Sequence, residues 1–159
     1  MAFPAFLDAC VLYPFYLCDT LLRLAEGGGY RPLWSGAVID EVSRALVRDG
    51  ANPESVARRA AAMRETFPDA EVTGYESLIP AMTNHEKDRH VLAAAVRADA
   101  AVIVTLNLRD FPHESLEPYE LEARHPDEFL LDQLDLYPPA PFGAYPSRPR
   151  TRRSALVRW

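Results

Sequence analysis

Two patterns of apolar residues follow one another along the chain: short continuous runs, and longer runs with helical spacing. Residues 5–12 form a short run that indicates a buried strand. Residues 101–105, Ala-Val-Ile-Val-Thr, indicate the clearest central strand because β-branched residues dominate them. Residues 71–73 indicate a weaker strand. The short runs therefore predict strands in three separate parts of the chain.

Helical spacing predicts four helices between and around these strands. They cover residues 16–26, Ser35 to about Arg48, Asn52 to near Phe67, and residues 85–99. Three glycines stop the first helix, and the side chains of Ser35 and Asn52 cap the second and third. Strands that alternate with helices indicate an α/β fold with a central parallel sheet, whose ligand sites lie beyond the carboxyl ends of the strands.

Length and composition fit one compact domain followed by a tail. The chain has 159 residues, of which 48% are hydrophobic, enough for a substantial core. We place the domain at residues 1–137 and a Pro/Arg-rich tail at residues 138–159. Five prolines prevent a regular helix or strand through the first half of the tail, so we expect an extended or flexible arm.

Charge is divided unevenly between these two parts. The tail carries five arginines and no acid, which leaves 12 basic against 23 acidic residues in the domain. An acidic domain argues against a broad electrostatic platform for nucleic acid, although its excess acids can serve as metal ligands.

No basic, apolar start reads as a signal peptide, and no apolar run approaches the length of a membrane span. Cys10 and Cys18 lack the spacing of a zinc site and are too few for a disulfide framework. We therefore expect a soluble, cytoplasmic protein with no membrane partner.

Asp88 departs most from the helical pattern. Within residues 85–99 it falls on the apolar arc, and no basic residue shares that arc, because Arg89, His90 and Arg97 point away. Burial of an unpaired carboxylate is costly. Two alternatives follow: Asp88 binds a metal ion together with other acids, or it lies at the helix start and accepts hydrogen bonds from free backbone N–H groups.

Other acids lie where a parallel sheet places its ligand sites. Asp8 lies within the first predicted strand, and Asp110 follows the strand at residues 101–105 after a short loop. On the second helix Glu41 borders the apolar stripe, whereas Asp40 points roughly opposite. Four acids that converge at one sheet edge can hold Mg²⁺ or Mn²⁺, and an ion held in this way suits hydrolysis of phosphodiesters. Neither a P-loop nor a nucleophile elbow is present.

Five segments, in order over about residues 3–137, resemble PIN-domain proteins of the VapC-like toxin type. They are Leu7-Asp8-Ala9-Cys10-Val11-Leu12-Tyr13-Pro14; Trp34-Ser35 with Asp40-Glu41-Val42; Lys87-Asp88-Arg89-His90-Val91-Leu92-Ala93-Ala94-Ala95; Val104-Thr105-Leu106-Asn107-Leu108-Arg109-Asp110-Phe111-Pro112; and Pro126-Asp127-Glu128-Phe129-Leu130. The resemblance implies a small α/β fold and Mg²⁺- or Mn²⁺-dependent cleavage of RNA by metal-activated water.

The resemblance also assigns roles to individual residues. Asp8, Glu41, Asp88 and Asp110 match the family's acidic metal ligands. Asn107 stands where many relatives have another Asp, so one well-held ion is expected and a second stays open.

Three further residues border these ligands in sequence. Thr105 either orients a ligand or water or merely ends a strand, and Arg44 and Arg109 are candidates for contacts with substrate phosphates.

Toxins of this kind pair with a small antitoxin protein and commonly form homodimers, so both partners are expected beside the RNA substrate. Two other functions stay open: a binding module that keeps the fold without catalysis, and a nuclease that acts in housekeeping rather than as a toxin. The basic tail is either an RNA-binding arm or an altered last element.

Overall fold

The strands form one five-stranded parallel sheet in the computed structural model, which describes residues 3–136. The strands are β1 (Pro4–Leu7), β2 (Arg31–Ser35), β3 (Glu71–Val72), β4 (Val102–Val104) and β5 (Glu122–Arg124). Their order across the sheet is β3-β2-β1-β4-β5, and every neighbouring pair is parallel. β1 therefore lies at the centre, where Phe6 is in register with Leu33 on one side and Ile103 on the other.

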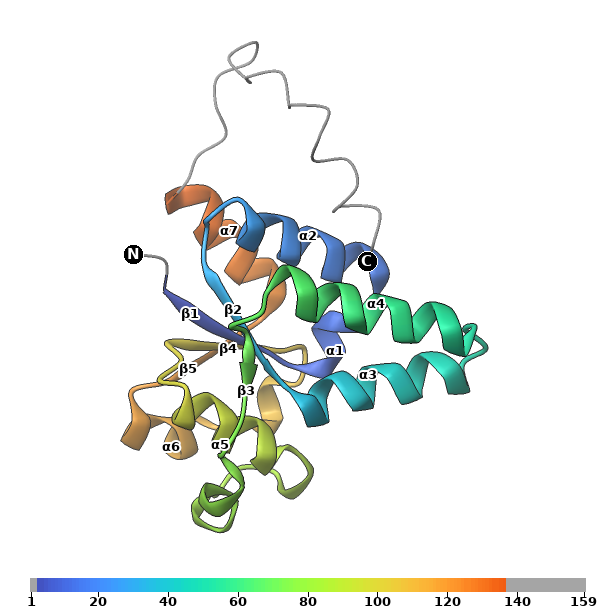
Figure 1. Ribbon diagram of the computed structural model, residues 1–159. Coiled ribbons are helices and arrows are strands. Elements are labelled where there is room, and N and C mark those ends of the chain that lie inside the picture. Colours follow the sequence, from blue (N-terminus) through green and yellow to red (C-terminus); the bar gives the residue numbers. More distant parts are fainter. Residues whose placement is uncertain (1–2, 137–159) are drawn as a thin grey trace.

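Helices cover both faces of this sheet. They are α1 (Ala9–Leu12), α2 (Phe15–Glu26), α3 (Gly36–Arg48), α4 (Pro53–Thr66), α5 (Arg89–Arg97), α6 (His113–Leu116) and α7 (Pro126–Leu136). Short 3₁₀ turns lie at Glu76–Ala81, Glu86–Asp88, Leu108–Asp110 and Glu117–Tyr119. Figure 1 shows α2 and α7 on one side of the sheet and α5 and α6 on the other. The architecture confirms the predicted α/β fold with a central parallel sheet flanked by helices.

The core lies on both faces of β1, whose residues Ala5, Phe6 and Leu7 have no exposed surface. On one side α5 buries five consecutive residues, 91–95, against β2, β4 and the turn Glu76–Ala81. Three of these five residues are alanines, so the helix backbone can approach the sheet closely. This close packing fixes the depth at which the start of α5 lies.

The helix boundaries follow the caps that the sequence predicts. Ser35 caps α3 by accepting a hydrogen bond from the Val38 N–H, and Asn52 caps α4. α2 ends at Glu26, immediately before the glycines. These three predictions are confirmed because cap chemistry depends on neighbouring residues only.

The first predicted strand is too long. β1 ends at Leu7, because the Asp8 carboxylate accepts a hydrogen bond from the Ala9 N–H at 2.8 Å and starts the short helix α1. Asp8 thus follows the strand rather than lying within it. The predicted helix at residues 85–99 is also shorter, since Glu86–Asp88 is a 3₁₀ turn and α5 ends at Arg97.

Two strands, β2 and β5, have no counterpart in the sequence prediction. β2 contains Pro32, which weakens a strand pattern, and β5 is the polar tripeptide Glu-Ala-Arg at the sheet edge. Both strands form because a partner strand lies beside them.

The predicted tail at residues 138–159 lies outside the described residues. Within residues 3–136, no helix has the length and apolarity that crossing a membrane requires.

Replacement of the α4 cap gives a test of the fold away from the acids. The Asn52 side-chain oxygen accepts hydrogen bonds from the N–H groups of Glu54 and Ser55 at 2.9 and 3.2 Å. Asn52→Ala should lower the free energy of unfolding by about 1 kcal/mol, measured by urea denaturation. Asn52→Asp, which keeps a capping oxygen, should retain most of the stability. An Ala variant as stable as the wild type would contradict this account.

Candidate active site

Three acids meet beyond the carboxyl ends of the two central strands. Asp8 follows β1 and Asp110 lies in the turn after β4, while Asp88 lies at the start of α5. Backbone hydrogen bonds hold these segments together: the Asp8 N–H donates to the Val104 carbonyl, and the His85 N–H donates to the Asp110 carbonyl. Asp8 and Asp88 are buried, with 3% and 5% of their surface exposed.

The Asp8 carboxylate is held by both of its oxygens. Oδ1 accepts from the Ala9 N–H, and Oδ2 accepts from the Thr105 hydroxyl at 2.9 Å. The Thr105 oxygen in turn accepts from the Asn107 N–H at 3.0 Å. Thr105 therefore orients Asp8, and it ties that orientation to the loop after β4.

Cys10 lies beside the same carboxylate, with its Sγ 3.6 Å from Asp8 Oδ2. Burial, followed by the charge of Asp8, raises the pKa of the Cys10 thiol to about 11. Near neutral pH the thiol is protonated, and a protonated thiol is a poor nucleophile. Cys10 therefore packs against the site rather than acting in it.

Asp88 does not cap the helix that it precedes. Its side chain makes no hydrogen bond with the N–H groups of α5, and its Oδ2 is buried without a hydrogen-bond partner among the described residues. Of the two alternatives that the sequence left open, the helix-start capping role is therefore absent. This oxygen, which accepts no hydrogen bond, is available to a cation.

A basic residue does reach this arc, which the helical pattern did not indicate. The Lys87 Nζ lies 3.8 Å from Asp88 Oδ2 and 3.3 Å from Asp110 Oδ2. Position 87 points away from the arc on a regular helix, but its turn is 3₁₀ and its side chain is long. Arg89 and His90 are half-buried rather than directed into solvent, and Arg89 donates to the Asn84 carbonyl.

The charges of the three acids are linked. Burial, followed by a hydrogen bond with Asp110 and the negative charge of Asp8, raises the pKa of Asp88 to about 7. At Asp110 burial acts in the same direction, but hydrogen bonds with Asp88 and Lys87 outweigh it and hold the pKa of that carboxyl below its usual value. A protonated Asp88 can donate to Asp110, whereas an ionised Asp88 cannot.

Glu41 lines an open cleft of about 790 Å³ between α1 and α3, which none of the other three acids lines. It is exposed, and so is its neighbour Asp40, which does not line the cleft. Lys87 and Leu106 also line this cleft, and Lys87 connects it to Asp88 and Asp110 through its ion pairs. Within residues 3–136, no group of three or more His, Cys, Asp or Glu side chains is already arranged to hold a metal ion.

The remaining predicted residues divide between the cleft and the surface. Arg44 lines the cleft together with Arg48, which the sequence reasoning did not single out. Asn107 and Arg109 are exposed in the loop after β4, and neither lines the cleft. The positive charge of the cleft therefore comes from α3 and Lys87.

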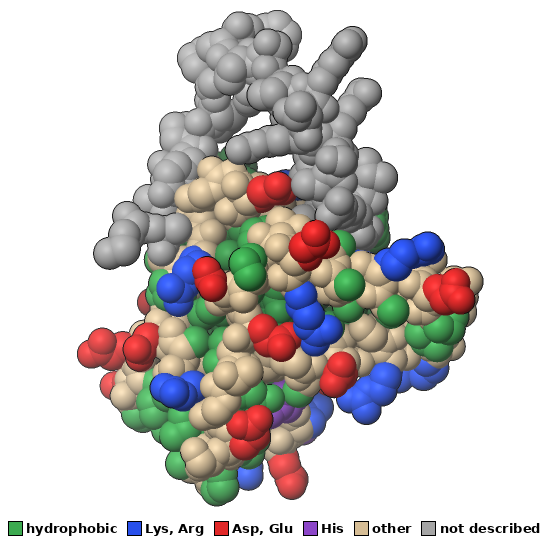
Figure 2. Space-filling model, viewed as in Figure 1, with side chains coloured by type: hydrophobic (Ala, Val, Ile, Leu, Met, Phe, Trp, Pro, Cys, Tyr) green, Lys and Arg blue, Asp and Glu red, His purple; other side chains and the backbone are tan. Residues whose placement is uncertain are grey.

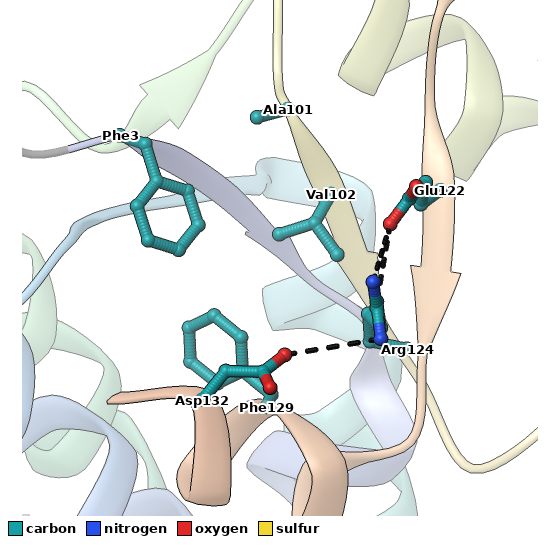
Figure 3. A pocket seen from close by; sticks show the side chains of 7 residues that line it. All are labelled: Phe3, Ala101, Val102, Glu122, Arg124, Phe129 and Asp132. Carbon is teal, nitrogen blue, oxygen red and sulfur yellow. Dashed lines mark hydrogen bonds and ion pairs between the residues drawn. The ribbon is translucent and has the colours of Figure 1, made fainter. Parts of the chain in front are cut away.

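Other surfaces of the described chain offer less. Figure 2 shows acidic and basic side chains intermixed on one face, with no extended patch of either sign. A second pocket, of about 470 Å³, lies at the opposite, amino ends of β1, β4 and β5, where Arg124 is paired with Glu122 and Asp132 (Figure 3). Parallel sheets place their ligands at the carboxyl ends, so the edge that carries the acids is the better candidate.

The raised pKa of Asp88 predicts how stability depends on pH without metal. Between about pH 4 and 7 the folded protein retains a proton at Asp88 that the unfolded chain releases, so the free energy of unfolding should fall as pH rises through that range. The lowered pKa of Asp110 acts with opposite sign, below about pH 4.

Urea denaturation in chelator at a series of pH values would measure this trend. Asp88→Asn should flatten it, whereas Asp40→Asn, which changes an exposed acid, should keep it. An Asp88→Asn variant with the wild-type slope would show that another group carries the pH dependence.

Comparison with known proteins shows the family to which the chain belongs. The family model described as "PIN domain" matches residues 4–109. Over 64 residues the chain is 69% identical to a protein of Mycobacterium tuberculosis (strain ATCC 25618 / H37Rv) named "Putative ribonuclease VapC50"; the match covers 40% of this chain and 38% of that protein. No solved structure matches the chain. The family model spans more than half of the chain and confirms the family resemblance: the chain belongs to the PIN-domain family.

Proposed function

We propose that the protein is a ribonuclease that hydrolyses RNA phosphodiester bonds with the help of Mg²⁺ or Mn²⁺. The observation that carries the proposal is the buried Oδ2 of Asp88, which makes no hydrogen bond and whose only ion pair among the described residues is with the exposed Lys87, beside two further acids at the carboxyl edge of a PIN-domain sheet. The relative named as a ribonuclease supports the same reaction, although the match spans well under half of that protein.

The residues at this edge suit a divalent ion. Carboxylate oxygens are the ligands that Mg²⁺ and Mn²⁺ prefer, and a buried carboxylate oxygen that accepts no hydrogen bond can coordinate such an ion. Asp8, Asp88 and Asp110 would hold the ion, with Glu41 as a fourth ligand across the cleft. A bound divalent ion lowers the pKa of a water molecule and stabilises developing charge on a phosphate.

The protein's own contribution is position and charge. Thr105 and the Ala9 N–H fix the orientation of the Asp8 carboxylate before any substrate arrives. Arg44 and Arg48 place positive charge along the cleft, where it can meet RNA phosphates, and Arg109 can add a contact from the loop after β4. Asn107 can offer a neutral oxygen, so a second ion would be held less firmly than the first.

We also propose that the protein acts as the toxin of a type II toxin–antitoxin pair, with a cognate antitoxin protein and a homodimeric state. This part rests on the resemblance of the five sequence segments to VapC-like toxins. Growth arrest on expression that Asp88→Asn relieves would support the toxin role, while unimpaired growth despite cleavage in vitro would favour a housekeeping nuclease.

Metal binding can be tested without substrate. If the carboxylates face one another, Mg²⁺ or Mn²⁺ should raise the melting temperature by mass action, by an amount that grows with ion concentration. Asp88→Asn should remove most of this dependence, and Asp40→Asn should not change it. A wild-type melting temperature that ignores several millimolar of either ion would count against a metal site.

Catalysis can be tested on a panel of tRNAs and a structured ribosomal RNA fragment, with Mg²⁺, Mn²⁺ or chelator. Cleavage by the wild type should need the ion and should fall by about 100-fold or more in Asp88→Asn. Glu41→Gln and Asp40→Asn form a matched pair on one helix: the first, on the cleft, should lose activity, and the second should keep it. A folded wild type as inert as Asp88→Asn would favour a PIN-fold binding module instead.

A further inference from the structure

Lys87 is the only lysine in the sequence, and all other basic residues apart from histidine are arginines. Its Nζ lies between two of the acids, 3.3 Å from Asp110 Oδ2 and 3.8 Å from Asp88 Oδ2. Both ion pairs that these two aspartates make within the described residues are with Lys87. One compact cation therefore faces the carboxylates that we propose as metal ligands.

The position of this cation reduces the electrostatic repulsion among the carboxylates. Asp8, Asp88 and Asp110 lie close enough to influence one another, and like charges at one site repel. A positive charge between Asp88 and Asp110 offsets part of that repulsion when both are ionised. The buried backbone around them cannot move apart to relieve it, because α5 is packed tightly against the sheet.

The same cation is free to leave. The Lys87 side chain is 59% exposed, belongs to a three-residue 3₁₀ turn and borders the open cleft. Lysine is a hydrated point charge on a flexible stem, whereas arginine binds a carboxylate through two fixed N–H donors and is harder to displace. Because Nζ contacts Oδ2 of both Asp88 and Asp110, a divalent ion on these oxygens would take its place.

We propose that Lys87 is a positioning residue: its ammonium is the resident counter-ion of Asp88 and Asp110 in the metal-free protein, and a divalent ion displaces it. The pairing of Lys87 with the two aspartates does not depend on the proposed function, whereas its displacement by a divalent ion rests on the metal site proposed there. After the exchange the ammonium lies in the cleft that also holds Arg44 and Arg48.

Melting temperatures in chelator at about pH 8 test the first half. An ion pair with an exposed partner contributes modestly, so Lys87→Met should melt about 2–4 °C lower than the wild type. Arg48→Met removes a cation from the same cleft and breaks only the exposed pair of Arg48 with Asp49, so it should lose less, and Lys87→Arg should restore the loss. In an Asp88→Asn background, Lys87→Met should cost less than in the wild type. An equal or larger cost there would overturn the pairing.

A titration with Mn²⁺, followed by melting temperature, tests the exchange. Lys87→Met should bind the ion about 2- to 10-fold more tightly than the wild type, because no resident cation competes, and Lys87→Arg should bind it more weakly. An unchanged affinity in Lys87→Met would overturn the exchange. An ion that leaves the wild-type melting temperature unchanged would overturn both the proposed function and the exchange, while the chelator series would still decide the pairing.

The wild-type protein provides an independent readout, because an amine-acylating reagent can modify only one lysine. Peptide mass spectrometry distinguishes Lys87 from the α-amino group. Mn²⁺ should increase the acylation rate of Lys87 by releasing the ammonium, and in Asp88→Asn, which loses most of the metal dependence, the ion should leave the rate nearly unchanged. A wild-type rate that is unaltered by an ion that raises the melting temperature would overturn the exchange.

Discussion

Mutual repulsion between carboxylates at one edge of the sheet is the constraint that the surrounding structure answers. Each of the three acids is held by a different element, so the movement of one segment cannot relieve the repulsion among them. Asp8 is fixed by the N–H that begins α1 and by the Thr105 hydroxyl, and Asp110 by its backbone link to His85. Asp88 is set by the depth of α5. The acids are brought together because their elements meet at this edge of the sheet, whatever the order of those elements along the chain.

Much of this arrangement could be predicted from the sequence because it depends on local chemistry. Ser35 and Asn52 cap helices through their own neighbours, and Asp88 interrupts an apolar stripe within one segment. β2 and β5 could not be predicted in the same way. β2 contains a proline and β5 contains two charged residues, so these segments form strands only when a partner strand lies beside them. Their formation is a property of the assembled sheet.

The helical periodicity could not predict the contact of Lys87 with Asp88 and Asp110, for a different reason. A helical projection places each residue by its angle, but a 3₁₀ turn changes that angle, and a long side chain crosses to another element. Glu41 depends on packing as well: the helical pattern places it beside the apolar stripe of α3, and the packing of α3 against α1 brings it to the cleft. Which acids meet is decided by tertiary packing.

Asp8 serves the fold and the candidate site at once. Its Oδ1 accepts the hydrogen bond that begins α1, while its Oδ2 accepts from the Thr105 hydroxyl. A change at Asp8 therefore alters a helix start, the link to the loop after β4 and the charge of the site together, and loss of activity there cannot be separated from loss of structure. Asp88 has no such double duty, since its side chain caps nothing. Although both acids are buried, Asp8 contributes hydrogen bonds that the fold uses, whereas Asp88 is only held in place by the fold. A substitution at Asp88 can therefore change the chemistry of the site without removing a cap from the fold.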